Sequence, residues 1–246
     1  MTEISYLAAV VLVAFVVESA AGFGATVVTV TLGAQILPLD AVLAAFLPVN
    51  VALSLVLTVR NAKAIDRGLL LRQVLPWMGA GTAVGLALSR YRAAGWIKVV
   101  FAAFVIVLSI AELLAMRARA DQRSTPLRPT VAASALAGAG VIHGLFACGG
   151  PLVVYVVGRT LSEKAAFRAT LSALWLVMNV VLVASMAIDG SLGGKSLVTS
   201  AALLPPLVVG LLAGDRLHHR MPERAFRVAV FALLLVAATV LVVRSV

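Results

Sequence analysis

Long apolar runs separated by short polar or basic segments recur along all 246 residues of the chain. A membrane-spanning helix needs about 20 mostly apolar residues, and several of these runs reach that length. One predicted helix begins at Asp40 and ends at Arg60, the next carries Pro76 and ends near residues 89–92, and a further run covers about residues 95–116. The pattern predicts an all-α polytopic membrane protein.

Two apolar runs are interrupted by glycine-rich segments. The run over residues 4–37 is too long for a single span and is divided at Gly22-Phe23-Gly24, and a second break follows at residues 144–151, Gly-Leu-Phe-Ala-Cys-Gly-Gly-Pro. In hydrocarbon, unpaired backbone groups cost several kcal/mol each, so such a break survives only inside protein or beside a wet cavity. Two breaks in corresponding halves of a chain indicate the binding site of a transporter.

The two halves of the sequence repeat one another. An offset of 129 relates five pairs of marked residues: Phe46/Trp175, Asn50/Asn179, Pro76/Pro205, Gly81/Gly210 and Gly85/Gly214. Upstream the offset is 125, which pairs Glu18 with His143, Gly22 with Ala147 and Gly24 with Gly149. One four-residue insertion between residues 157 and 172 reconciles the two registers. We therefore predict an internal duplication, with a first membrane repeat over 1–116, a basic linker over 117–129 and a second repeat over 130–246.

The basic residues predict how the repeats are oriented. If each broken run is a hairpin that enters and leaves on one side, the segments 60–72, 117–128, 159–168 and 214–227 share a side and hold 15 of the 20 Lys and Arg residues. If each broken run crosses once, the 20 Lys and Arg residues of the chain divide 10 against 10 between the two sides. The positive-inside rule favours hairpins. Each repeat is then a re-entrant hairpin plus three spans, so the repeats are inverted and both termini lie outside.

Composition excludes several other classes of protein. The chain is 62% hydrophobic and 12% charged, with a formal net charge of +10 that topology explains better than nucleic-acid binding does. The single cysteine, Cys148, excludes an internal disulfide and belongs to no metal-binding spacing. The first run does not resemble a cleaved signal, since no basic segment precedes it. We expect the lipid bilayer and a small anion as partners, no cofactor, no metal and no nucleic acid, and we leave a homodimer open.

The breaks provide chemistry suited to an anion. A helix that starts inside the bilayer presents N–H groups without intrahelical acceptors and the positive end of its dipole. Glycine permits close approach to the backbone, and Pro151 fits the first helical turn. Close helix packing is the structural alternative, which we prefer for the glycine pairs at 81/85 and 210/214. The predicted substrate-binding residues at the breaks are Gly22, Gly24, Ala25, Thr26, Cys148, Gly149 and Gly150.

Polar residues inside the apolar runs complete the predicted site. Asn50 and Asn179 occupy equivalent mid-helix positions and are either substrate donors or an interhelical hydrogen bond. Glu18 and His143 lie one turn before each break, where an ionisable group is a candidate for proton coupling or a static hydrogen bond. Phe46 and Trp175 are candidates for the wall of the site. No catalytic residues are predicted, because Glu18, His143 and Cys148 alone are too few for an enzyme site.

The motifs resemble those of the sulfite exporter TauE/SafE family over nearly the whole chain. Each Gly-x-Gly-Gly-like break is followed by an Asn-bearing helix and a Pro-x4-Gly-x3-Gly helix, although Ala25 and Thr26 stand where the family often has glycine. The resemblance implies a transporter of sulfite, sulfonates or related small anions, and we expect a multi-pass protein of the inner (plasma) membrane. An intramembrane enzyme and a passive anion channel of the same architecture are the alternatives. The motifs do not decide the substrate, the direction or the coupling ion.

Overall fold

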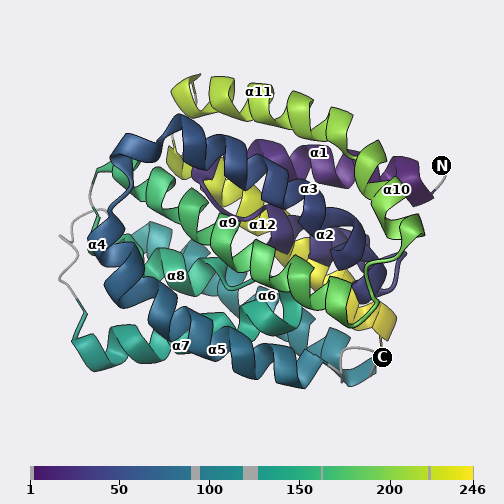
Figure 1. The fold of residues 1–246 in the computed structure, drawn as a ribbon, viewed down its shortest axis with the longest axis horizontal. Helices are drawn as coiled ribbons and strands as arrows, with labels where there is room; N and C mark the ends of the chain where they lie inside the picture. Colours follow the sequence, from purple (N-terminus) through teal and green to yellow (C-terminus); the bar gives the residue numbers. More distant parts are fainter. Residues whose placement is uncertain (1–2, 90–94, 119–126, 162, 221–222, 246) are drawn as a thin grey trace. The chain divides into compact units, whose positions relative to one another are not determined.

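The described part of the chain is all helical. The structure is a computed structural model that describes residues 3–89, 95–118, 127–161, 163–220 and 223–245, with no strand among them (Figure 1). Its elements are α1 (Glu3–Ala21), α2 (Ala25–Gly33), α3 (Leu39–Arg60), the 3-10 turn η1 (Ala62–Ala64), α4 (Arg67–Leu69), the π-helical turn η2 (Leu70–Val74), α5 (Leu75–Leu88), α6 (Gly95–Ala118), α7 (Pro129–Phe146), α8 (Gly150–Val157), α9 (Lys164–Ile188), α10 (Gly194–Ala202), α11 (Leu204–Arg220) and α12 (Glu223–Ser245). This confirms the predicted fold class.

The helices divide into two compact units, and each unit takes segments from both halves of the sequence. Unit 1 comprises Met1–Val42, Tyr91–Arg123 and Pro205–Val246, and unit 2 comprises Leu43–Arg90 and Ser124–Leu204. The predicted repeats and linker therefore describe the duplicated sequence and not the compact units. Most of the predicted basic linker, residues 119–126, lies outside the described residues.

Both glycine-rich breaks reverse the direction of the chain. In unit 1 the Tyr6 hydroxyl donates to the Leu32 carbonyl at 3.0 Å, and a Cβ on Gly24 would lie 3.2 Å from Val17, so α2 runs back along α1. In unit 2 a Cβ on Gly138 would lie 3.9 Å from Leu152, and Gly149 packs against Ala139, so α8 runs back along α7. Each broken run is thus a hairpin, with a long first arm and a second arm of 9 residues in α2 and 8 in α8.

The paired glycines let helices from different halves pack closely, as expected from the sequence. In unit 2, α5 lies along α7 (Figure 1), and side chains on Gly81 and Gly85 would collide with the backbone carbonyls of Ala137 and Val141. In unit 1 a Cβ on Gly210 would lie 3.1 Å from the carbonyl oxygen of Leu12, and one on Gly214 would lie 2.7 Å from that of Val16.

These two packings correspond residue for residue. Ala137 and Val141 stand 125 positions after Leu12 and Val16, while the glycines differ by 129. The helix contacts of unit 1 therefore recur in unit 2 at the same offsets, 125 and 129 residues, from which the duplication was predicted. Each half also supplies the helix that packs on the hairpin of the other half.

Proline explains the irregular helices at equivalent places in the two halves. Proline lacks an N–H and clashes with the carbonyl one turn earlier, so the helix before it is disturbed. The π-helical turn η2 ends two residues before Pro76, and the helix formed by α10 and α11 is interrupted at Leu203, two residues before Pro205.

The structure also places the four-residue insertion of the second half. The connection from α8 to α9 has six residues against five between α2 and α3, and α9 has 25 residues against 22 in α3. Because α8 and α9 begin 125 residues after α2 and α3, the longer connection is balanced by the shorter α8, and the insertion falls within α9, after Lys164, in the region predicted from the sequence. Among the residues that the structure describes, five helical segments are long and apolar enough to cross a membrane: Glu3–Ala20, Leu39–Arg60, Pro129–Phe146, Lys164–Ile188 and Gly194–Leu217.

Candidate functional site

The break in unit 2 is a left-handed helix cap followed directly by a new helix. Helix α7 ends at Phe146, and Ala147 adopts φ 56°, with its N–H donating to the His143 carbonyl at 2.7 Å. Helix α8 then starts at Gly150, and no side chain caps its N-terminus. The N–H groups of its first turn therefore lack a side-chain acceptor, as the anion-site hypothesis requires.

The break in unit 1 begins with the same cap. Gly22 adopts φ 83°, and its N–H donates to the Glu18 carbonyl at 2.7 Å, as Ala147 does to His143. Glu18 and His143 thus occupy the same place in the two hairpins, which confirms the predicted 125-residue register. Gly24 caps α2 with φ 108°, again without a side-chain hydrogen bond.

The second glycine of each break differs between the copies. Gly24 needs the freedom of glycine for its positive φ, whereas Gly149 adopts an ordinary right-handed conformation with φ −68°. A Cβ on Gly149 would collide with the Ala139 carbonyl and lie 3.0 Å from the His143 Cβ. Packing against α7 therefore explains why residue 149 has no side chain, and the contact of its backbone with an anion stays a prediction.

Asn50 and Asn179, predicted as partners in the site, do meet. The Asn179 amide nitrogen donates to the Asn50 side-chain oxygen at 3.3 Å, and the two residues are 1% and 2% exposed. The Ser54 hydroxyl donates to the same Asn50 oxygen at 3.2 Å. The repeat pattern did not point to Ser54, because its equivalent in the second half is Val183. The oxygen of the Asn179 amide is buried and has no hydrogen-bond partner within the described structure.

His143 lies against the same helix as Asn179. Its ring stacks on Trp175, with the ring centroids 6.0 Å apart and the planes at 27°, and Trp175 stands one turn before Asn179 on α9. The ring is fully buried beside the main chain of Ala147 and Met178. Neither ring nitrogen makes a hydrogen bond of good geometry within the described residues, although main-chain groups of Met178 and Ala147 lie near enough to act on the ring electrostatically. We call His143, Trp175, Asn179, Asn50 and Ser54 the amide cluster.

The remaining predicted site residues are buried at their own break. Ala25 and Thr26 open α2 in unit 1, while the free thiol of Cys148 lies at the tip of the hairpin in unit 2 beside Gly150. Glu18 is 4% exposed in unit 1. Because the units are each described by themselves, the expectation that both breaks surround one ligand stays a prediction.

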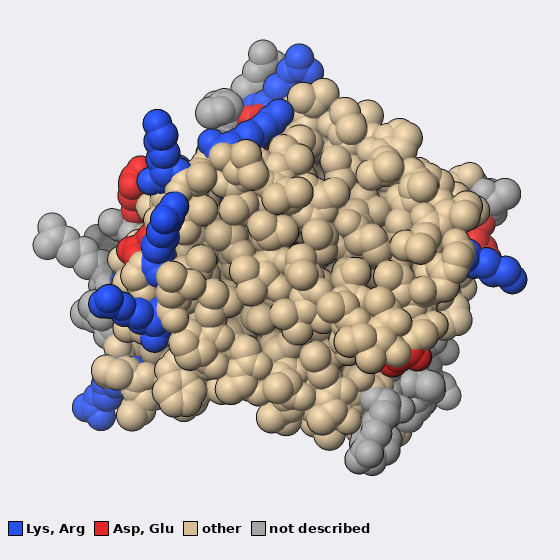
Figure 2. Space-filling view, viewed as in Figure 1, with Lys and Arg blue, Asp and Glu red and all other residues tan. Residues whose placement is uncertain are grey.

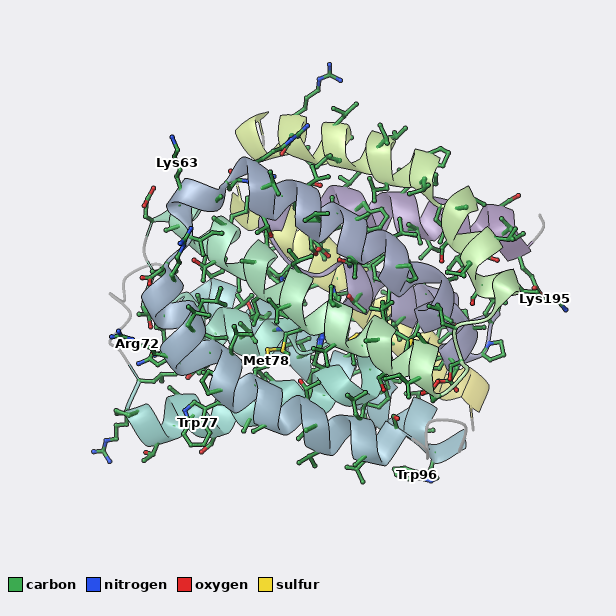
Figure 3. All side chains as sticks on the ribbon, viewed as in Figure 1. Lys63, Arg72, Trp77, Met78, Trp96 and Lys195 are labelled. Atoms are coloured by element: carbon green, nitrogen blue, oxygen red, sulfur yellow. The ribbon has the colours of Figure 1, made fainter. Side chains whose placement is uncertain are left out.

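The basic segments of unit 2 gather at one end of that unit. The Asp66 N–H donates to the Thr170 hydroxyl at 3.0 Å, which joins the segment 60–72 to the start of α9. Helices α5 and α7 run parallel, so Arg128 lies at the same end. Figure 3 shows Lys63 and Arg72 at this end and Lys195 at the other, and Figure 2 shows the cationic side chains collected there. A single crossing at the second break would have separated these segments, so the hairpin interpretation holds for unit 2.

These features define a class of protein, which is a multi-pass helical membrane protein with two glycine-broken hairpins. The family model for the sulfite exporter TauE/SafE matches residues 7–241, nearly the whole chain. The chain therefore belongs to the sulfite exporter TauE/SafE family. Neither the comparison with curated proteins nor that with solved structures gave a match. Within the described residues, no three His, Cys, Asp or Glu side chains come together as a metal site.

Proposed function

We propose that this protein is a secondary transporter of a small anion, such as sulfite, a sulfonate or a related small organic anion, in the plasma membrane. Family membership supports an anion transporter. The observation that carries the site is the buried hydrogen bond between Asn50 and Asn179, equivalent residues of the two halves. At 3.3 Å it is longer than the usual 2.9–3.0 Å, and we propose that a bond to the ligand replaces it.

The amide cluster binds the anion through neutral groups. The proposed donors of the cluster are the Asn179 amide and the His143 ring. The uncapped start of α8 adds backbone N–H groups from the same unit. The ring of Trp175 forms one wall of the site. Gly22, Gly24, Ala25 and Thr26 of the first break are proposed as the equivalent contacts in unit 1.

Anion flux into proteoliposomes tests this site. Sulfite uptake is measured for the wild type and for Asn50→Ala and Asn179→Ala. Asn61→Ala is the matched control, since the Asn61 amide follows the end of α3 and donates to the Leu57 carbonyl. Loss of one hydrogen bond to a charged ligand costs about 1.5–3 kcal/mol, so each cluster variant should bind sulfite about 10- to 150-fold more weakly. Equal uptake by all four proteins would place the substrate elsewhere.

A carrier and a channel make opposite predictions for exchange. A carrier exchanges one bound substrate for another across the membrane. Unlabelled sulfite inside the vesicles should therefore drive labelled sulfite to accumulate transiently above its equilibrium concentration. A passive channel shows no such counterflow. Recovery of the substrate without chemical change separates both from an enzyme.

A further inference from the structure

We propose that the amide cluster selects anions that also carry a hydrogen-bond donor, such as hydrogensulfite or a hydroxyl-bearing sulfonate. This inference rests on the proposed transport function and specifies its substrate class. It starts from polar atoms of the cluster that lack hydrogen-bond partners in the described structure. These are the side-chain oxygen of Asn179 and the two ring nitrogens of His143, all of them buried.

The acceptor is the side-chain oxygen of Asn179. The Asn50 oxygen already accepts from Ser54 and from the Asn179 amino group, so the amide of Asn179 turns its amino group toward Asn50 and its oxygen away. Leaving a buried acceptor without a donor carries an energetic cost. An anion that has only acceptor oxygens leaves that cost in place, whereas a ligand with an O–H or N–H group removes it.

The complementary group is the imidazole of His143. In either protonation state it offers at least one N–H donor, and it is 0% exposed. It stacks on Trp175, and residues one turn apart on a helix, such as Trp175 and Asn179, have Cβ atoms about 5–6 Å apart. In this proposal one small ligand lies between the two groups, with an anionic oxygen accepting from His143 and a hydroxyl donating to Asn179.

A matched pair of ligands tests the inference. Isethionate and propane-1-sulfonate are both fully ionised monoanions, and they differ only by a terminal hydroxyl in place of a methyl group. Their affinities are measured by competition with sulfite flux in proteoliposomes of the full chain. We expect wild type to prefer isethionate by about tenfold or more, the ratio that follows from one buried unpaired acceptor.

Two variants separate the roles. Asn179→Leu removes the acceptor at similar size and should bring the ratio between the two ligands close to one. His143→Phe keeps the ring against Trp175 but removes both nitrogens, so it should weaken both ligands and leave the ratio unchanged. If Asn179→Leu does not insert, the wild-type ratio alone decides the matter.

Several outcomes would overturn the inference. Equal wild-type affinities mean that a water occupies the acceptor. A preference for propane-1-sulfonate means that both amides are reversed and present a donor. If neither sulfonate binds, the pH dependence of sulfite uptake decides the matter. At fixed total sulfite, uptake must then rise and fall with the concentration of hydrogensulfite and not with that of the sulfite dianion. This must hold both in wild type and in His143→Phe. If sulfite is not transported at all, the proposed function itself fails, and this inference fails with it.

Discussion

At the scale of single residues, the two hairpins use the same cap with different amino acids. Gly22 and Ala147 are equivalent, and both adopt positive φ, at 83° and 56°. An L-residue in this conformation costs roughly 1–2 kcal/mol, a cost that glycine avoids. Ala147 therefore holds strain that its counterpart does not.

Exchanging these residues should change stability in opposite directions. We expect Ala147→Gly to raise the free energy of unfolding by about 0.5–1 kcal/mol and Gly22→Ala to lower it by at least about 1 kcal/mol. Unfolding of the purified protein in mixed detergent micelles measures both changes. Two shifts of the same sign would contradict the assigned caps.

Proton coupling is also decided at single residues. Glu18 and His143 are buried at equivalent caps, and an ionisable group within a membrane segment is a functional candidate by default. Under coupling, at least one of Glu18→Gln and His143→Gln should still bind sulfite while its flux no longer responds to an imposed pH gradient. Flux of sulfite in proteoliposomes, with and without the gradient, measures this response. An unchanged response in both variants would leave the two residues as structural.

At the scale of elements, the glycine faces of α5 and α11 decide how closely helices approach. Side chains at Gly85 and Gly214 would meet the backbone of α7 and α1, whereas a side chain at Gly79 would meet nothing within 4 Å. We expect Gly85→Ala and Gly214→Ala each to destabilise the protein by about 1–3 kcal/mol. The control Gly79→Ala should stabilise it by about 0.5–1 kcal/mol, since alanine favours the helix. Thermal unfolding of the detergent-purified variants measures all three, and equal shifts would contradict the packing.

Sequence reasoning reached the elements because apolar length and helix-breaking residues are local signals. The helix α3 ends at Arg60 and the two breaks lie at Gly22 and Gly149, as the sequence predicted. The repeat spacing of the glycines at 81, 85, 210 and 214 also predicted correctly that they pack against other helices. The contact of Ser54 with Asn50 was missed, because Ser54 has no equivalent polar residue in the other half. The packing of Gly149 against Ala139 was missed, because it depends on a fold-back of the chain that spacing alone does not show. The stacking of His143 on Trp175 was missed for the same reason, although both residues had been singled out.

At the scale of the whole molecule, the hairpins and the basic ends set the topology. In unit 2 the hairpin opens at the basic end, near Arg128 and Arg159. In unit 1, α1 and α11 run parallel, so the hairpin opens at the end opposite Arg216. If all basic ends face the cytoplasm, the two hairpins enter from opposite sides. The inverted arrangement stays a prediction on this basis.

Cysteine labelling from outside intact cells tests that prediction. In a Cys148→Ala background, Ile36→Cys and Thr160→Cys place thiols just after α2 and α8, at the open ends of the two hairpins. We expect an impermeant maleimide to modify the first and not the second. Labelling of both positions from one side would show that the repeats are parallel.

The exchange of helices between the halves has a consequence for biosynthesis. Helix α5 leaves the ribosome well before α7, so its glycine face has no protein neighbour until residues 137–144 have been inserted. The hairpin of α1 and α2 waits longer still, until α11 has been made. Neither half of the chain completes a compact unit alone. The first half must therefore remain inserted in the bilayer, with its packing faces in contact with lipid, until the second half has been made. Two separately expressed halves, in contrast, contain every segment needed to rebuild both units.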